Sequence, residues 1–100
     1  MTLLPVRVSD EADADISGAA SWYAERSMKV AVGFIEAVYS EVGFIAQFPN
    51  GAQRVRGMVR QLKVNGFPFV ILYRPMKDHL AVVRVFHTSQ HPKKKFKRKK

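Results

Sequence analysis

The sequence predicts an α+β domain in which an antiparallel sheet packs against a helical hairpin, in the order β-α-α-β-β-β. Three short segments at residues 58–64, 68–74 and 79–87 are rich in Val, Leu, Ile, Phe and Tyr, as half-buried strands require. Two segments upstream of them repeat their apolar residues at helical spacing. A helical hairpin alone cannot bury its apolar faces, so we expect it to lie across the sheet.

The N-terminal part of the chain predicts a short strand and a first helix. Apolar residues up to Val8 indicate the strand, and Ser9 or Asp10 offers an N-cap for the helix that follows. This helix should end near residues 26–28, where a second amphipathic segment begins. Its apolar face comprises Ala12, Ile16, Ala19 and Tyr23.

The second amphipathic segment predicts a longer helix that ends at residues 49–51, Pro-Asn-Gly. The short connection makes the two helices an antiparallel hairpin. We expect Trp22, Tyr23 and Phe34 to pack against the sheet, because large aromatic side chains dominate the cores of small domains. The apolar stripe of the second helix comprises Ala31, Phe34, Val38, Ile45 and Phe48.

Turn sequences separate the three C-terminal strands. Asn65-Gly66 lies between the first two of them, and Asn-Gly is the strongest short hairpin signal. Residues 76–78, Met-Lys-Asp, lie where the chain must reverse again. The three strands should therefore form an antiparallel meander.

The positive charge of the chain is concentrated at one end. The 100 residues carry 17 Lys and Arg against eight Asp and Glu, and seven of these cations lie in the final segment KKKFKRKK. We therefore predict a single, nearly balanced domain over residues 1–92. The basic tail, residues 93–100, should be disordered when free because its like charges repel one another.

The basic tail has two interpretations. It is either a solvated end that keeps the protein soluble or an electrostatic contact with nucleic acid or an acidic partner. Phe96, inside the run, could stack on a base or anchor in an apolar groove. The cations assigned to such a contact are Lys93, Lys94, Lys95, Lys97 and Arg98.

Composition argues against several classes of site. The absence of Cys excludes disulfides and thiolate metal sites and fits a cytoplasmic protein. No spacing of His, Asp and Glu indicates a metal site, and there is no glycine-rich phosphate loop, so we expect neither a metal nor a cofactor. The N-terminus does not have the pattern of a signal peptide. No apolar run approaches the length of a membrane span, so we expect no membrane contact.

Four segments in order resemble toxins of the RelE/ParE superfamily from bacterial type II toxin–antitoxin modules. They are EADADISGAASWYAER, AVGFIEAVYSEVGFIAQFPNG, VRQLKVNGFPFVILYR and, after the acidic turn at Asp78, LAVVRVFHTSQHP; together the resemblance covers residues 5–92. It implies the small α+β toxin fold and a role in growth arrest and plasmid stabilisation. It also implies an acidic antitoxin that folds onto the toxin, with Arg54, Arg56 and Arg60 as candidate antitoxin-binding residues.

The superfamily contains two activities, and this sequence departs from one of them. RelE-like members cut mRNA in the ribosomal A site, with one arginine on the third strand and another just after the last strand. Here Val70 and Thr88 stand at the matching positions. The last-strand sequence RVFHTS and Tyr73-Arg74 are instead similar to ParE-like members, which poison DNA gyrase. The resemblance therefore implies a gyrase inhibitor that acts by binding, without catalytic residues of its own.

Two alternatives remain open. The first is a ribosome-dependent mRNA endonuclease in which Arg60 and Arg84 stabilise charge and His87 moves protons. His87 could instead be a strand-end histidine that hydrogen-bonds the backbone and orders the tail. The second is a non-catalytic nucleic-acid-binding module that works through the tail. Arg84 and His87 are also the candidate contacts with the target in the gyrase interpretation.

The two arginines also have structural interpretations. Alternation along the last strand predicts that Arg84 shares a face with its apolar neighbours, where it contacts the target or pairs with an acid. The apolar neighbours are Leu80, Val82 and Phe86, and the candidate acids are Asp15 and Glu41. Arg60 stands among apolar residues, which favours a partly buried ion pair over a catalytic role.

Overall fold

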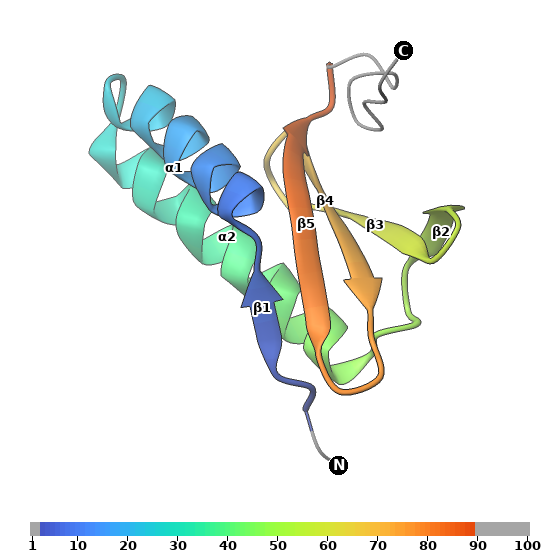
Figure 1. The fold of residues 1–100 in the computed structure, drawn as a ribbon. Helices are drawn as coiled ribbons and strands as arrows, with labels where there is room; N and C mark the ends of the chain where they lie inside the picture. The colour runs from blue at the N-terminus through green and yellow to red at the C-terminus, as the bar shows by residue number, and fades with distance from the viewer. Residues whose placement is uncertain (1–2, 90–100) are drawn as a thin grey trace.

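The chain folds into two layers, with a five-stranded sheet on one side and two helices on the other (Figure 1). The computed structural model describes residues 3–89, and these counts refer to that part of the chain. The predicted α+β fold is confirmed. The elements are β1 (Val6–Val8), α1 (Asp10–Ala24), α2 (Met28–Gln47), β2 (Gln53–Arg56), β3 (Val59–Lys63), β4 (Phe69–Pro75) and β5 (Leu80–His87).

The sheet has the strand order β1-β5-β4-β3-β2. Strands β3 to β5 pair antiparallel in sequence order, as predicted, β2 adds antiparallel to β3, and β1 pairs in parallel with β5. The predicted turns are present: Gly66 has a φ of +86° between β3 and β4, and Met76 N–H donates to the carbonyl of His79 between β4 and β5. A positive φ is the conformation that glycine adopts most easily.

Strand β2 is the one element that the sequence did not predict. The sequence indicated three strands after the helices, and the structure has four. β2 has only four residues, three of them exposed, so it carries no apolar alternation to reveal it. Gly57, with a φ of +54°, allows the tight turn that returns the chain into β3.

The core lies between the sheet and the inner faces of both helices. α1 contributes few large side chains to it, whereas α2 contributes a continuous buried stripe. Tyr23, Phe34, Phe67 and Phe69 form an aromatic cluster with ring centroids 4.9–6.3 Å apart, at the end of the sheet where β4 begins. The predicted packing of Tyr23 and Phe34 against the sheet is confirmed.

Two other aromatic predictions were wrong. Trp22 is 53% exposed, because it lies about 100° around α1 from the inward Tyr23, and the guanidinium of Arg26 stacks on it at 3.6 Å. Phe48 is 50% exposed, because α2 ends at Gln47 and the next residue leaves the helical path. Phe48 contacts Phe44 instead, with ring centroids 5.3 Å apart.

A second, smaller apolar cluster lies on the face of the sheet turned away from the helices. Val70, Leu72 and Phe86 are buried there, and Val55 and Val59 pack against them. Because side chains alternate along β4, Phe69, Ile71 and Tyr73 belong to the main core, and Val70 and Leu72 belong to this cluster. The sheet is therefore apolar on both faces.

Helix α2 matches a membrane span by its length and composition. This differs from the expectation that no apolar run of the sequence approaches that length. Its apolar character has a different explanation in this fold. Six of its residues are buried, and most of them belong to the core cluster formed with α1 and the sheet. We therefore interpret α2 as the core helix of the domain.

Candidate functional site

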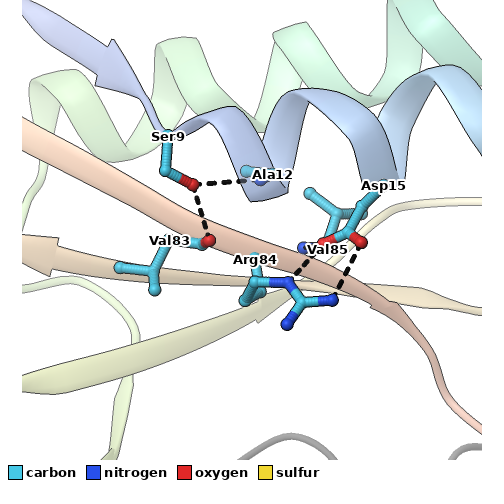
Figure 2. Close-up of polar contacts among 6 residues, drawn as sticks. All are labelled: Ser9, Ala12, Asp15, Val83, Arg84 and Val85. Carbon is cyan, nitrogen blue, oxygen red and sulfur yellow. Dashed lines mark hydrogen bonds and ion pairs between the residues drawn. The ribbon is translucent and has the colours of Figure 1, made fainter.

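Part of the outer edge of strand β5 is not paired with β1 and instead contacts the start of helix α1. β1 pairs with β5 only from Leu80 to Val82, and Ser9 then turns the chain into α1. The N–H of Ser9 donates to the carbonyl of Val82 (3.0 Å), and its hydroxyl donates to the carbonyl of Val83 (2.8 Å; Figure 2). The same hydroxyl accepts from the N–H of Ala12 (3.0 Å), which confirms Ser9 as the N-cap. Ser9 thus both caps the helix and pairs with the strand edge.

Asp15, six residues beyond Ser9 in α1, makes the next contact along this edge. Its carboxylate accepts two hydrogen bonds from Arg84, Nε–Oδ2 at 2.8 Å and Nη2–Oδ1 at 3.0 Å (Figure 2). Oδ2 also accepts from the N–H of Val85 at 2.9 Å. These hydrogen bonds raise the pKa of Arg84, although partial burial opposes the shift. Of the two acids that the sequence offered to Arg84, the structure selects Asp15; Glu41 instead accepts from the N–H of Asn65.

A β-bulge in β5 separates residues that the sequence placed together. Val83 stands opposite no residue of β4, because the register shifts at this point. Arg84 therefore shares a face with Phe86, whose ring centroid lies 4.5 Å from its Cζ, and not with the core residues Leu80 and Val82. The predicted common face was correct for Phe86 and wrong for the other two, because the alternation rule fails across an inserted residue.

Arg60 binds backbone carbonyls of the loop after α2. Its Nη1 donates to the carbonyl of Ala52 at 2.6 Å and, more weakly, to that of Asn50 at 3.4 Å. The expected ion pair is not among its contacts in the described part of the chain. Tyr73, opposite Arg60 in the sheet, donates its hydroxyl to the carbonyl of Pro49 at 2.9 Å. Burial raises the pKa of Tyr73, and the positive charge of Arg60 partly offsets this shift.

His87 ends β5 beside the aromatic cluster. Its ring packs edge-on against Phe69, with centroids 5.1 Å apart. Its Nδ1 accepts from the N–H of Ser89 at 3.0 Å, and the Ser89 hydroxyl lies 2.8 Å from the same nitrogen. The expected hydrogen bond between a strand-end histidine and the backbone is therefore present. In a neutral ring, this acceptor role places the proton on Nε2.

The three residues of the endonuclease alternative do not converge. Arg60 stands opposite Tyr73, on the face of the sheet that carries the helices, whereas Arg84 belongs to the other face. His87 stands opposite Phe69, four residues along β4 from Tyr73, which is about 13 Å along the strand. No single phosphate could contact all three in this arrangement.

The candidate antitoxin-binding arginines divide between the two faces of the sheet. Arg54 pairs in register with Arg60, so these two lie on one face, and Arg54 is exposed. Arg56 stands opposite Val59, which packs into the second apolar cluster. The tail cations Lys93, Lys94, Lys95, Lys97 and Arg98 lie outside the described residues.

A pocket of about 550 Å³, which was not predicted from the sequence, lies between α1 and the end of β5. Its walls include Asp15, Ala19, Trp22, Phe69, Val85 and His87. The pocket exists because α1 carries only small residues over positions 17–21, Ser-Gly-Ala-Ala-Ser, where it passes the end of the sheet. That run of small residues is the only indication of the pocket in the sequence. It can be recognised as one only when the position of α1 against β5 is known.

The arrangement offers recognition by charge and apolar surface, and it offers little for metal binding. Among residues 3–89, no three His, Cys, Asp or Glu side chains come close enough to hold a metal ion. Every buried side-chain nitrogen or oxygen in this part of the chain has a hydrogen-bond partner. Asp15, Arg84, Arg60 and Tyr73 are thus engaged with one another or with the backbone.

Comparisons with known proteins agree with this architecture. The family model described as the ParE toxin of the type II toxin–antitoxin system parDE matches residues 6–92. A chain of the structure described as the chromosomal ParDE TA system from P. aeruginosa is similar in fold, with a TM-score of 0.77 and 20% identity, over 87% of this chain and 98% of that one. No curated protein matches the chain. Because the family model spans most of the sequence, the protein belongs to the ParE toxin family of type II toxin–antitoxin systems.

Proposed function

We propose that this toxin arrests growth by binding DNA gyrase, without cutting a nucleic acid itself. The family assignment makes the chain the toxin of a type II toxin–antitoxin system, with an antitoxin as its partner. The target is the part that we infer. The inference depends on which groups the arginines of the sheet contact. It also depends on which residues lie on the face of the sheet that is turned away from the helices.

The observation that supports binding over RNA cleavage is the ion pair between Arg84 and Asp15. A phosphate ligand would have to compete with a carboxylate that already accepts two hydrogen bonds from the Arg84 guanidinium. The neighbouring positions on the same face are apolar: Val70 and Leu72 on β4 and Phe86 on β5 are all buried. Charge stabilisation of a cleaving phosphate needs free, converging cations, and these buried apolar neighbours supply none.

We place the gyrase contact at the end of β5, which carries Arg84 and His87 and is followed in sequence by the basic tail. Acidic surfaces on a partner would be attracted to the seven cations of the tail, which raises the rate of encounter. The contacts of Ser89 with the His87 ring fix the chain where β5 ends. Under this proposal, His87 has a structural role and carries no proton in a reaction.

A growth experiment separates the two activities of the superfamily. The toxin is expressed without antitoxin in a bacterial host, once as wild type and once as His87→Ala. We expect both forms to arrest growth with broken chromosomal DNA and intact transcripts. Transcript ends are mapped by sequencing, and DNA breaks are measured by pulsed-field electrophoresis.

If the toxin is instead an mRNA endonuclease, the same cells should show the opposite result. Transcripts would be cut at codon positions within translated regions, chromosomal DNA would stay intact, and His87→Ala would restore growth. That combination would overturn the gyrase proposal. A control with Glu36→Ala on the exposed side of α2 reports whether expression level alone changes the outcome.

We also propose that Arg54 and Arg60, paired in register between β2 and β3, receive acidic residues of the antitoxin. An added strand or an amphipathic helix could bring such residues to this edge. Arg54→Glu should weaken antitoxin binding at least about tenfold, because it replaces attraction by repulsion across the interface. Calorimetric titration measures the effect, with Lys77→Glu, in the turn between β4 and β5, as the control of equal charge. Equal losses in both variants would contradict this placement.

A further inference from the structure

The pocket between α1 and β5 is lined mainly by apolar and aromatic side chains. Ala19 and Trp22 of α1 form one side, and Phe69, Val85 and His87 of the sheet form the other. Trp22 remains 53% exposed beside it. An opening of about 550 Å³ with these walls can accept one large apolar side chain, with room for the backbone that carries it.

One end of the pocket is acidic. Asp15 belongs to the pocket wall, and Glu11 precedes it by one helical turn, on the same side of α1. Helix α1 carries four acidic residues and no basic one. Arg84 balances one of these charges, and Arg26, which stacks on Trp22, pairs with Glu25 at 3.6 Å, so the rim keeps an excess of negative charge. An occupant should therefore combine an aromatic or aliphatic side chain with neighbouring cations, and an acidic peptide fits poorly.

The sequence contains one segment with this chemistry, and it follows β5 directly. In the tail KKKFKRKK, Phe96 is the single apolar residue and has cations on both sides. Phe96 is seven residues beyond Ser89, a distance of up to about 23 Å when extended. His87, two residues before Ser89, already lies in the pocket wall. Phe96 can thus reach the pocket within the same molecule.

We propose that the basic tail docks on its own domain, with Phe96 in the pocket between α1 and β5 and the flanking lysines beside Glu11 and Asp15. A short tether gives an effective concentration in the millimolar range, so even a weak contact would be occupied. Docking would present the remaining cations as one ordered surface at the end of β5. This inference concerns the chain alone and holds whether the target is gyrase or another molecule.

The chain is well suited to a direct test because it has no Cys and a single Trp. A nitroxide is attached to the full chain at Lys99→Cys, and broadening of amide and indole signals is recorded by NMR on ¹⁵N-labelled protein. We expect loss of the Trp22 indole signal and of the Ala19 amide signal, and recovery of both when Phe96→Ala is added. The exposed Gly43 on α2 provides an internal reference that should keep its signal.

The controls separate docking in the same molecule from its competitors. Phe96→Leu keeps an apolar side chain of similar size and should retain most of the broadening, whereas Phe96→Ser should not. The core residues described above do not include Phe96, so we expect its variants to leave the sheet intact. Uniform broadening over the surface, or broadening unaffected by Phe96→Ala, would overturn the proposal. In a second experiment, ¹⁵N-labelled protein without a nitroxide is mixed with nitroxide-labelled protein at natural isotope abundance. Broadening in this mixture would assign the contact to a second copy of the chain and would also overturn the proposal.

Discussion

Asp15 is the residue through which helix α1 holds the free edge of β5. Its carboxylate accepts from two nitrogens of Arg84 and from the N–H of Val85, and only 17% of its side chain is exposed. The sequence offered Asp15 as one of two possible partners for Arg84, because an arginine between apolar strand residues needs an acid. It could not choose between them, since the choice depends on how α1 crosses the sheet.

Asp15→Ala should lower the free energy of unfolding by about 1–3 kcal/mol, because it leaves the N–H of Val85 and the guanidinium of Arg84 without their acceptor. Asp15→Asn, which keeps one acceptor oxygen, should cost less. Urea denaturation followed by circular dichroism measures both. Asp13→Ala is the matched control in the same turn, where the side chain is exposed. If all three variants lost the same stability, Asp15 would contribute only helix-dipole energy.

The burial of Tyr73 should make the free energy of unfolding fall at alkaline pH. Burial raises the pKa of Tyr73, so the folded protein favours the neutral phenol. This contribution is fully present below the pKa of an exposed tyrosine, about 10, and is lost as the pH rises through the higher pKa of the folded state. Tyr73→Phe should cost about 1 kcal/mol near neutral pH, by removing the hydrogen bond to Pro49, and should reduce the alkaline loss.

The measurement is the free energy of unfolding of both proteins at neutral pH and above about pH 10. Tyr39→Phe is the control, because Tyr39 is 45% exposed and should change neither value. An alkaline loss of the same size in wild type and Tyr73→Phe would show that other groups cause it.

The individual elements differ in how much of them the sequence reveals. Both helices have strong periodicity and serine N-caps, and their bounds follow closely from these signals. Strand β2 was missed because four mostly exposed residues contain no pattern. The bulge at Val83 was missed because it is fixed by the pairing of β4 with β5 and not by local preference. The pocket was missed for a related reason, since its two walls come from distant parts of the chain.

A comparison of the two N-cap serines, Ser9 and Ser27, tests how much the contact between α1 and β5 contributes to stability. Ser9 caps α1 and also donates to the carbonyl of Val83, whereas Ser27 caps α2 by accepting an exposed hydrogen bond from the N–H of Val30. Ser27→Ala should therefore cost about 1 kcal/mol, the usual value for a lost cap. Ser9→Ala should cost about 1 kcal/mol more, because the strand carbonyl also loses its donor. Thermal or urea unfolding compares the two, and equal losses would mean that the contact with β5 contributes nothing.

At the scale of the whole molecule, the fold separates a helical layer from a sheet whose open face is apolar. The sequence resemblance correctly predicted the family, and the family model supports it over residues 6–92. The choice between gyrase and ribosome rests on where Arg60, Arg84 and His87 lie, which the sequence alone could not place. Their separation over two faces and about 13 Å of strand favours a protein that acts by contact.

Inhibition of gyrase is measured by titrating the purified full chain, free of antitoxin, into a DNA supercoiling reaction. We expect supercoiling to stop at toxin concentrations close to that of the enzyme and cleaved DNA to accumulate. His87→Ala should still inhibit, at a higher concentration if it weakens the contact, because it removes no catalytic group. Full supercoiling at a large excess of toxin that circular dichroism shows to be folded would rule out gyrase as the target.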